Sequence, residues 1–378
     1  MTTDVAISGF GVWSAFGRGP GPLLDHVFQG KANFRTVDRF DVTRFRSHHA
    51  AQATDAPTMA QAFADAAQDA VAMAELSLPG RAGVLLGTQG DWSGLTSYWR
   101  TGELRGLPAA TAGHHPAGLA AALALGPGRR RAFVNGCIAA TTAIIQAAQL
   151  IAYGREQVVF AGGGYLVDEE FFAKFDSGHA LTTASVVRPF SRDRSGLLLG
   201  DGLAVLILEP LHQVLDRGAR PLAVISGWGL ASDAYHVCRP HPDGRGMALA
   251  ISRALERAGA AAADIDYVNA HGTGTPANDP AESRAIRHVF GAQPPPVSST
   301  KSTTGHALEG SGALEAVISV LALTHGLLPP TAGFTEVDPD CAVDCVPNAP
   351  RQIAVRQVVS LSAAFGGANA ALVLRRPS

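Results

Sequence analysis

Short apolar runs alternate with helix-length segments along the whole chain. The apolar runs predict strands at residues 5–8, 83–86, 133–134, 158–161, 204–208, 224–227, 267–269, 297–299, 358–362 and 371–374. Longer segments with apolar residues at helical spacing predict helices at 59–74, 138–152, 247–258, 279–290 and 313–323. Strands that alternate with helices are typical of an α/β protein in which helical layers cover the sheets.

Two of these predicted helices, 138–152 and 313–323, are apolar on nearly every side. A helix without a polar face is expected to be buried all round. Each follows a short strand and a polar turn, AFVNGC before the first and VSSTKSTTGH before the second. This pseudo-repeat predicts two similar halves, 1–215 and 216–378. No Pro/Ser-rich linker separates them, so we expect the halves to pack as one unit.

The composition excludes several classes of protein. The chain has 378 residues, of which 47% are hydrophobic and 16% are charged, with a net charge of −2. These values are unlike those of a disordered chain or a coiled coil, and no basic excess indicates a nucleic-acid or membrane partner. No segment resembles a signal peptide or a membrane span. Four cysteines are too few for a disulfide framework, so we expect a cytoplasmic protein.

Some short motifs have an ordinary structural interpretation. The GFGVWS segment at 9–14 lacks the third glycine and the acidic residue of a dinucleotide-binding fingerprint, and AGGG at 161–164 lacks the lysine of a phosphate loop. Cys341 and Cys345 have no second pair of ligands for a structural zinc site. Cys238 has two histidines within three residues but little carboxylate support. We therefore expect no metal site.

Cys137 stands out among the cysteines. It ends a predicted strand and begins the first buried helix, in the segment VNGCIAATTAII. The N–H groups and the dipole of a helix N-terminus favour a thiolate, which predicts a pKa below that of a free thiol. The same N–H groups can polarise an acyl oxygen, and Gly136 leaves room for a substrate.

Two histidines accompany this cysteine. His271 lies in HGTGTPANDPAE and His306 in KSTTGH, each in a loop that follows a predicted strand. Lys301 comes five residues before His306. A reactive cysteine together with two imidazoles is a typical set for nucleophilic catalysis.

With these motifs in this order, the chain resembles the β-ketoacyl-ACP synthases of the thiolase-like superfamily, the type II fatty acid and polyketide condensing enzymes. The segments that carry the resemblance are VAISGFGVWSAFG, VNGCIAATTAI, HGTGTPANDPAE, KSTTGH and SAAFGGANAALVL. The resemblance implies a thiolase-like fold with two pseudo-repeated βαβαβαββ halves in a layered α-β-α-β-α arrangement.

The resemblance also implies roles for the residues. Cys137 would hold an acyl chain as a thioester, and malonyl-ACP (ACP, acyl carrier protein) would lose CO₂ to give the enolate that attacks it. His271 and His306 would stabilise that enolate. Lys301, with Glu282, would hold the loop of the second histidine in a charged network.

Further residues acquire roles in the same way. Thr273 and Thr275 would contact the 4′-phosphopantetheine arm, which arrives on the carrier protein, so that no permanently bound cofactor is needed. The backbone N–H groups of Cys137 and Ala363 would form the oxyanion hole. Four residues are assigned to the acyl pocket and its gate: Ile138, Ala363, Ala364 and Phe365.

The chain departs from the family pattern at several of these positions. Ile138 replaces a small residue and would narrow the acyl channel, while Ala363 and Ala364 replace an aromatic gate and a glycine. Glu309 replaces a glycine and places a charge close to the site. These departures favour a specialised polyketide or polyene pathway over ordinary fatty acid elongation.

Two alternatives remain open at this point: a non-catalytic chain-length subunit, and an acyltransferase that acylates an alcohol or an amine. In either case the resemblance implies a homodimer, or a heterodimer with a second ketosynthase-like subunit. Basic residues that could receive the carrier protein are Arg44, Arg46 and 129–131.

Overall fold

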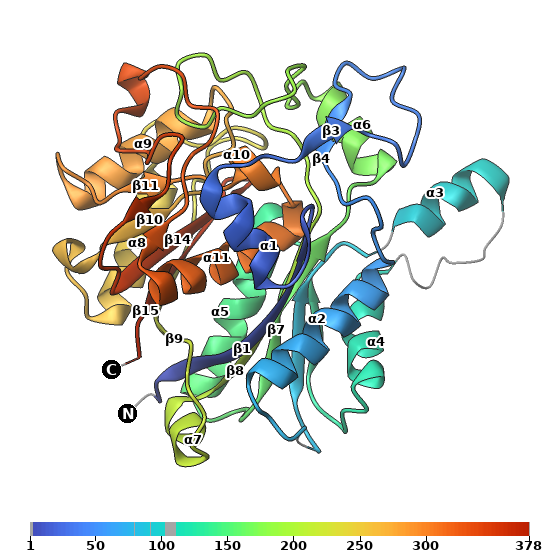
Figure 1. The fold of residues 1–378 in the computed structure, drawn as a ribbon, viewed down its shortest axis with the longest axis vertical. Coiled ribbons are helices and arrows are strands. Elements are labelled where there is room, and N and C mark those ends of the chain that lie inside the picture. The colour runs from blue at the N-terminus through green and yellow to red at the C-terminus, as the bar shows by residue number, and fades with distance from the viewer. Residues whose placement is uncertain (1–2, 79, 91, 103–110, 378) are drawn as a thin grey trace.

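The computed structural model describes residues 3–78, 80–90, 92–102 and 111–377 (Figure 1). The main elements of the first half are β1 (Val5–Ser14), α2 (Met59–Met73), β5 (Gly83–Gly87), α4 (His114–Ala122), β6 (Arg130–Phe133), α5 (Ala139–Ala152), β7 (Val159–Tyr165) and β8 (Gly202–Pro210). Those of the second half are β9 (Ala223–Ser232), α8 (Arg245–Ala258), β10 (Tyr267–Asn269), α9 (Asn278–Phe290), β11 (Val297–Ser298), α11 (Ser311–His325), β14 (Gln357–Ala364) and β15 (Ala368–Arg375).

Shorter elements lie between these. They are β2 (Gly17–Arg18), α1 (Pro20–Asp25), η1 (Val27–Gln29), β3 (Phe34–Thr36), β4 (His49–Ala51), α3 (Trp92–Thr101), η2 (Gly136–Ile138), α6 (Glu169–Ser177), α7 (Leu211–Asp216), η3 (Ala262–Asp264), α10 (Lys301–Thr304), η4 (Leu308–Gly310), β12 (Leu327–Leu328), η5 (Pro339–Cys341) and β13 (Arg351–Gln352). The elements that position the functional side chains are η2, α10 and η4, all of them short.

The strand order shows the internal repeat. The main strands follow the order β11-β10-β14-β15-β9 in the second half and β6-β5-β7-β8-β1 in the first. Strands at the same position along each half therefore take the same place in these two orders. In each half the first three of these pairings are parallel, parallel and antiparallel in matching places. Pairing of β1 with β9 joins both groups into one 11-stranded sheet. The predicted α/β class and the repeated βαβαβαββ order are therefore confirmed.

The layers follow from which helices contact which strands. Helices α5 and α11 contact each other and strands of both halves, so they form the middle layer. Helix α2 covers β1 and β8 on one outer face, and α8 covers β9 and β15 on the other (Figure 1). The nearly all-round apolar sequences of α5 and α11 fit this central place, because a helix in contact with the strands of both halves has little contact with water.

Close contact between the two central helices depends on small residues. A Cβ atom added at Gly312 of α11 would lie 2.0 Å from Oγ1 of Thr141 in α5. Thr141 is buried, and its hydroxyl oxygen lies 2.9 Å from that of Ser362 in β14. A glycine at this position therefore lets the two helices and the sheet come together beside the catalytic loops.

The glycine motif at the start of the chain is also a packing feature. An added Cβ would lie 2.2 Å from the carbonyl oxygen of Ala70 at Gly9, and 1.9 Å from that of Ala66 at Gly11. Helix α2 thus lies directly on the backbone of β1, and only glycine permits this approach. The strand runs on to Ser14, beyond the predicted end at residue 8.

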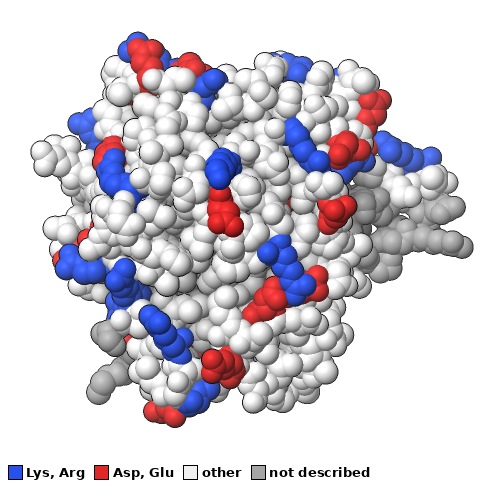
Figure 2. Space-filling model, in the orientation of Figure 1, with Lys and Arg blue, Asp and Glu red and all other residues white. Residues whose placement is uncertain are grey.

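Charged side chains of both signs are intermixed on the face drawn in Figure 2.

Within the described part of the chain, no helix combines the length and the apolar character needed to cross a membrane.

Candidate active site

Cys137 lies in η2, between the end of β6 and the start of α5. Gly136 precedes it with φ +65°, a left-handed conformation that favours glycine and turns the chain sharply into the helix. The cysteine is 9% exposed and lines a cavity of about 530 Å³. The other predicted site residues that line this cavity are His271, Thr273, Thr275, His306, Ala363, Ala364 and Phe365.

The two histidines come together from different loops of the second half. His271 follows β10 and His306 follows α10, and their ring centroids are 5.2 Å apart at an angle of 81°. Burial lowers the pKa of both imidazoles well below the ordinary value, and the charge of Lys301 acts in the same direction. Both rings are therefore neutral near pH 7. A neutral imidazole keeps one N–H group, which can donate a hydrogen bond to a substrate oxygen.

The orientation of His306 is set by a neighbour on the central helix. Its Nδ1 atom lies 2.8 Å from Oγ of Ser311, the first residue of α11. If the serine hydroxyl donates to Nδ1, the proton of the neutral ring sits on Nε2. This tautomer offers a donor to the cavity.

The electrostatic prediction for Cys137 was wrong. The sequence favoured a lowered thiol pKa at a helix N-terminus, but burial raises the pKa of Cys137 to about 12. The charge of Glu309 raises it further, and Lys301 opposes both effects without cancelling them. Removal from water therefore outweighs the position at the helix terminus.

The direct ion-pair partner of Lys301 is a residue that the sequence did not indicate. Its ammonium group forms a buried ion pair with Glu315 of α11, while Glu282 interacts with Lys301 only through its charge. Burial raises the pKa of Glu315 to about 7 even though Lys301 opposes that shift. Lys301 thus connects α10 to the central helix and lies close enough to influence the pKa of both histidines.

Glu282 instead holds the loop of the other histidine. Its two carboxylate oxygens accept hydrogen bonds from the backbone N–H groups of His271 at 2.7 Å and of Gly272 at 2.8 Å. The side-chain amide of Asn278 donates to it at 3.0 Å. Burial raises the pKa of Glu282 to about 7. It fixes the backbone from which His271 projects.

The predicted pocket residues divide into two groups. The hydroxyl oxygens of Thr273 and Thr275 are 2.9 Å apart on the cavity wall. Phe365 is 59% exposed and stacks on Phe175 at the mouth, with ring centroids 5.7 Å apart. Ile138, in contrast, is 4% exposed and packs in the apolar core around the central helices. It is not among the described residues that line this cavity, and its effect on the acyl channel stays a prediction.

The remaining cysteines have other surroundings. Cys341 and Cys345 are buried in the apolar core of the second half, and all four cysteines are free thiols. Cys238 is exposed, at the mouth of the cavity, where its backbone N–H donates to Nδ1 of His236. Across the ranges that the structure describes, no three His, Cys, Asp or Glu side chains are grouped as a metal site.

The candidate basic residues are partly engaged within the molecule. Arg44 pairs with Glu169 and Arg129 with Glu156, while Arg130 donates to the carbonyl oxygen of Ala82 at 2.6 Å. Their role in docking stays a prediction.

Sequence reasoning missed Glu315 and Ser311, which position Lys301 and His306. A signal for the first was present, because Glu315 is the one acidic residue in the largely apolar stretch 311–325. A lone charge on a buried helix needs a partner. No comparable signal marked Ser311.

Comparisons with known proteins place this geometry among related enzymes. The family model described as the N-terminal domain of beta-ketoacyl synthase matches residues 59–214, and that of the C-terminal domain matches residues 222–335. The chain is 34% identical over 413 residues to the tetracenomycin polyketide synthase ketoacyl synthase alpha subunit of Streptomyces glaucescens, covering 99% of this chain and 97% of that protein.

Two solved structures resemble it over their full length. One is described as the ishigamide ketosynthase/chain length factor, with a TM-score of 0.93, 34% identity and 100% coverage of both chains. The other, AntDE:AntF, is a type II polyketide synthase acyl-carrier protein in complex with its ketosynthase bound to the hexaketide. It has a TM-score of 0.94, 27% identity and 100% coverage of both chains. The expected thiolase-like ketosynthase fold is therefore confirmed.

Proposed function

The chain belongs to the beta-ketoacyl synthase family, and we propose that it condenses malonyl-ACP, with loss of CO₂, onto an acyl chain held as a thioester on Cys137. The observation that carries this proposal is the convergence of one buried thiol and two neutral imidazoles on the same cavity. A neutral imidazole suits the stabilisation of a developing enolate oxygen, since it can donate a hydrogen bond.

The first half-reaction transfers the acyl chain to the enzyme. The sulfur of Cys137 attacks the thioester carbonyl of acyl-ACP, a new S–C bond forms, and the bond from that carbon to the pantetheine sulfur breaks. The thiol proton leaves with the pantetheine sulfur. Because burial raises the pKa of Cys137 to about 12, this proton must be removed during the reaction, and the thiolate is not present in advance. The backbone N–H groups of Cys137 and Ala363 would stabilise the oxyanion.

The second half-reaction forms the carbon–carbon bond. The malonyl thioester loses its carboxylate as CO₂, and the electrons of the broken C–C bond form an enolate whose oxygen accepts hydrogen bonds from His271 and His306. The enolate carbon attacks the acyl carbonyl on Cys137, the S–C bond breaks, and the sulfur takes up a proton from solvent water. Thr273 and Thr275 would hold the pantetheine arm of the carrier protein on the cavity wall.

The two halves of the chain have different shares in this reaction. We assign Cys137 to the half 1–215, and the two histidines, Lys301 and Glu282 to the half 216–378. The site would then exist only where both halves pack around the central helices. This division agrees with the absence of a linker sequence between them.

We further propose a carrier protein and a second ketosynthase-like chain as partners, since one similar structure is a ketosynthase/chain length factor and another holds an acyl-carrier protein. The phosphopantetheine would come with the carrier. A cytoplasmic location agrees with four free thiols. The identity of 34% to a polyketide synthase subunit supports a specialised type II polyketide pathway.

The test is direct acylation. The protein is incubated with acyl-ACP, adducts are mapped by mass spectrometry, and malonyl-ACP is then added to measure CO₂ release and 3-oxoacyl-ACP. We expect the adduct on Cys137 and its loss in Cys137→Ala. The control Cys345→Ala changes a buried cysteine that lies outside the cavity.

Other outcomes identify the alternatives. An ester or amide product without CO₂ release would indicate an acyltransferase. Unchanged product from a reconstituted pair carrying Cys137→Ala would indicate a chain-length subunit. Either result would overturn the proposed condensation.

A further inference from the structure

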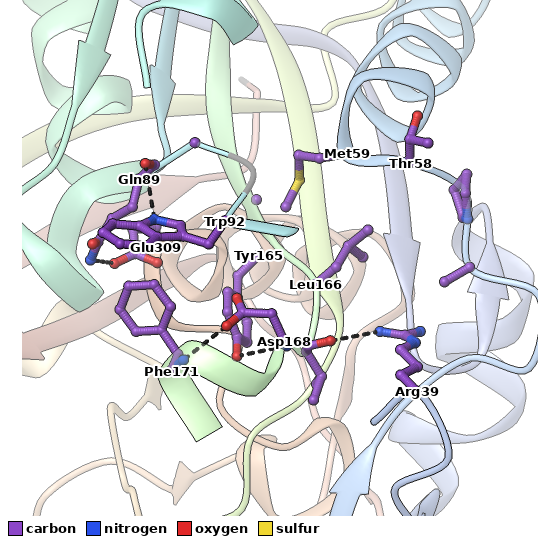
Figure 3. Close-up of a pocket in the computed structure, with 15 residues that line it drawn as sticks. Arg39, Thr58, Met59, Gln89, Trp92, Tyr165, Leu166, Asp168, Phe171 and Glu309 are labelled. Atoms are coloured by element: carbon purple, nitrogen blue, oxygen red, sulfur yellow. Dashed lines mark hydrogen bonds between the residues drawn. The ribbon is translucent and has the colours of Figure 1, made fainter. Parts of the chain in front are cut away.

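A second cavity has a volume of about 270 Å³, and Figure 3 shows the residues that line it. Its polar wall includes Arg39, Gln89, Tyr165, Asp168 and Glu309. It shares no described lining residue with the cavity that contains Cys137. Ligand pockets usually begin at roughly 300 Å³, so this space suits part of a ligand better than a whole one.

A cluster of packed side chains lies between this second cavity and the nucleophile. One buried apolar cluster includes Cys137 and three residues of the cavity wall, namely Tyr165, Val167 and Phe171. The element η2, which carries the cysteine, packs against η4, which carries Glu309. An acyl chain on Cys137 that extends inward, away from the mouth, would reach the second cavity by displacing side chains of this apolar cluster, because buried side chains are closely packed.

Glu309 lies in the wall of the second cavity, at the end of this path from Cys137. It is 2% exposed, and the preceding residue, Leu308, has φ +38°, a strained conformation for a residue with a branched side chain. The amide of Gln89 donates to one of its carboxylate oxygens, as Figure 3 shows. The carboxyl group also lies against its own backbone N–H. A carboxylate can accept about four hydrogen bonds, so Glu309 keeps unused capacity beside the cavity.

Burial also affects the protonation of this group. It raises the pKa of Glu309, so that the group takes up a proton more readily than an exposed glutamate. A protonated carboxyl can donate to a keto oxygen, and an ionised one can accept from a hydroxyl group. A saturated alkyl chain at the same place would leave this buried polar group without a new partner, which is unfavourable.

We propose that Glu309 is a specificity-determining residue of the acyl site. The chain on Cys137 reaches Glu309, which favours acyl chains with a hydroxyl or keto oxygen at that point over saturated chains of the same length. This inference rests on the proposed function, because it requires an acyl chain on Cys137. The substrate class is thus an oxygenated acyl chain.

The test compares octanoyl-ACP with a series of hydroxyoctanoyl-ACP and oxo-octanoyl-ACP probes that carry the oxygen at different carbons. Each probe competes with octanoyl-ACP for Cys137, and the adducts are quantified by mass spectrometry. We expect at least one oxygenated probe to be preferred by about tenfold, from the usual cost of an unpaired buried polar group. Glu309→Gln should keep the preference, and Glu309→Leu should abolish it.

Two further variants strengthen the comparison. Glu256→Leu changes an exposed glutamate on α8 and should leave the preference unchanged. Gln89→Leu removes the amide that donates a hydrogen bond to the Glu309 carboxylate. The carboxylate is then free to bind the acyl chain, so the preference for an oxygenated chain should increase. This measurement is independent of whether Glu309→Leu folds.

Failure of this inference differs from failure of the proposed function. Adducts that form on Cys137 with no preference for oxygen, or with the same preference in Glu309→Leu as in the wild type, would overturn the role of Glu309 alone. An unaltered preference in Gln89→Leu would count against it as well. No adduct on Cys137 with any probe would overturn both proposals.

Discussion

Replacing Lys301 by methionine should make the stability of this protein strongly dependent on pH. Lys301 and Glu315 are 1% and 2% exposed, and they form an ion pair between α10 and the central helix α11. Burial raises the pKa of Glu315 from 4.5 to about 7, and Lys301 limits that rise. Methionine is unbranched and fills a similar space without the charge. The variant therefore leaves Glu315 buried with no cation beside it.

The expected magnitude follows from the protonation of Glu315. In the variant its folded-state pKa lies above 7, so the folded chain holds a proton that the unfolded chain releases above pH 4.5. Stability then falls by about 1.4 kcal/mol per pH unit as pH rises toward that pKa. In the wild type the same fall ends near pH 7, because Glu315 is then ionised in both states. The difference in stability should thus grow between pH 7 and 9, by at most roughly 3 kcal/mol if the fall continues over both pH units.

Urea unfolding followed by circular dichroism at pH 5.5, 7 and 9 measures this difference. Lys31→Met, which changes an exposed lysine, is the matched control and should show no such trend. The double variant Lys301→Met/Glu315→Leu should regain stability at pH 9, since apolar residues of similar volume can replace a buried ion pair at little cost. A loss of the same size at all three pH values would refute the reasoning, as would a double variant no more stable than the single one.

Three more predictions address other parts of the structure. Burial raises the pKa of Cys137 to about 12, so its reaction with iodoacetamide should become about tenfold faster for each pH unit between pH 7 and 10. Site-resolved mass spectrometry measures this rate, and a plateau below pH 9 would show that burial does not control the pKa of the thiol. Gly312→Ala should lower the free energy of unfolding by about 1–3 kcal/mol, because the new Cβ would lie 2.0 Å from Oγ1 of Thr141. Gly21→Ala, with open space at its Cβ, is the control for that urea titration, and equal losses would contradict the packing argument. Glu282→Gln replaces one of the two accepting oxygens by an NH₂ group that faces a backbone donor, so kcat for condensation should fall by about a hundredfold while the circular dichroism spectrum is unchanged; full activity would exclude the positioning role.

The elements of the fold were largely predictable because their signals are local. The predicted helix 59–74 corresponds to Met59–Met73, and 279–290 to Asn278–Phe290. Strand β1 was predicted too short, because the glycines in its second part interrupt the apolar pattern that marks a strand. These glycines are present where α2 lies against the strand. The apolar character of 138–152 and 313–323 correctly indicated the central layer.

The candidate site was predictable to a smaller extent. The motifs around Cys137, His271 and His306 marked residues that do line one cavity. The neighbours of these residues were not predictable in the same way. Ile138 follows the cysteine directly in the chain, yet its side chain packs into the core. One step along the chain therefore separates a site residue from a core residue, and only the backbone direction at η2 distinguishes them.

The sequence by itself determined the α/β alternation, the internal repeat and the types of chemical group available for catalysis, because each depends on residue type and on spacing within a short segment. Tertiary structure decided which groups meet and how they ionise. It paired Lys301 with Glu315 and turned Glu282 toward the backbone of His271. It also raised the pKa of Cys137 through burial, against the expectation from its helix terminus. Desolvation and pairing depend on every element packed around a group, and most of those elements are distant in sequence.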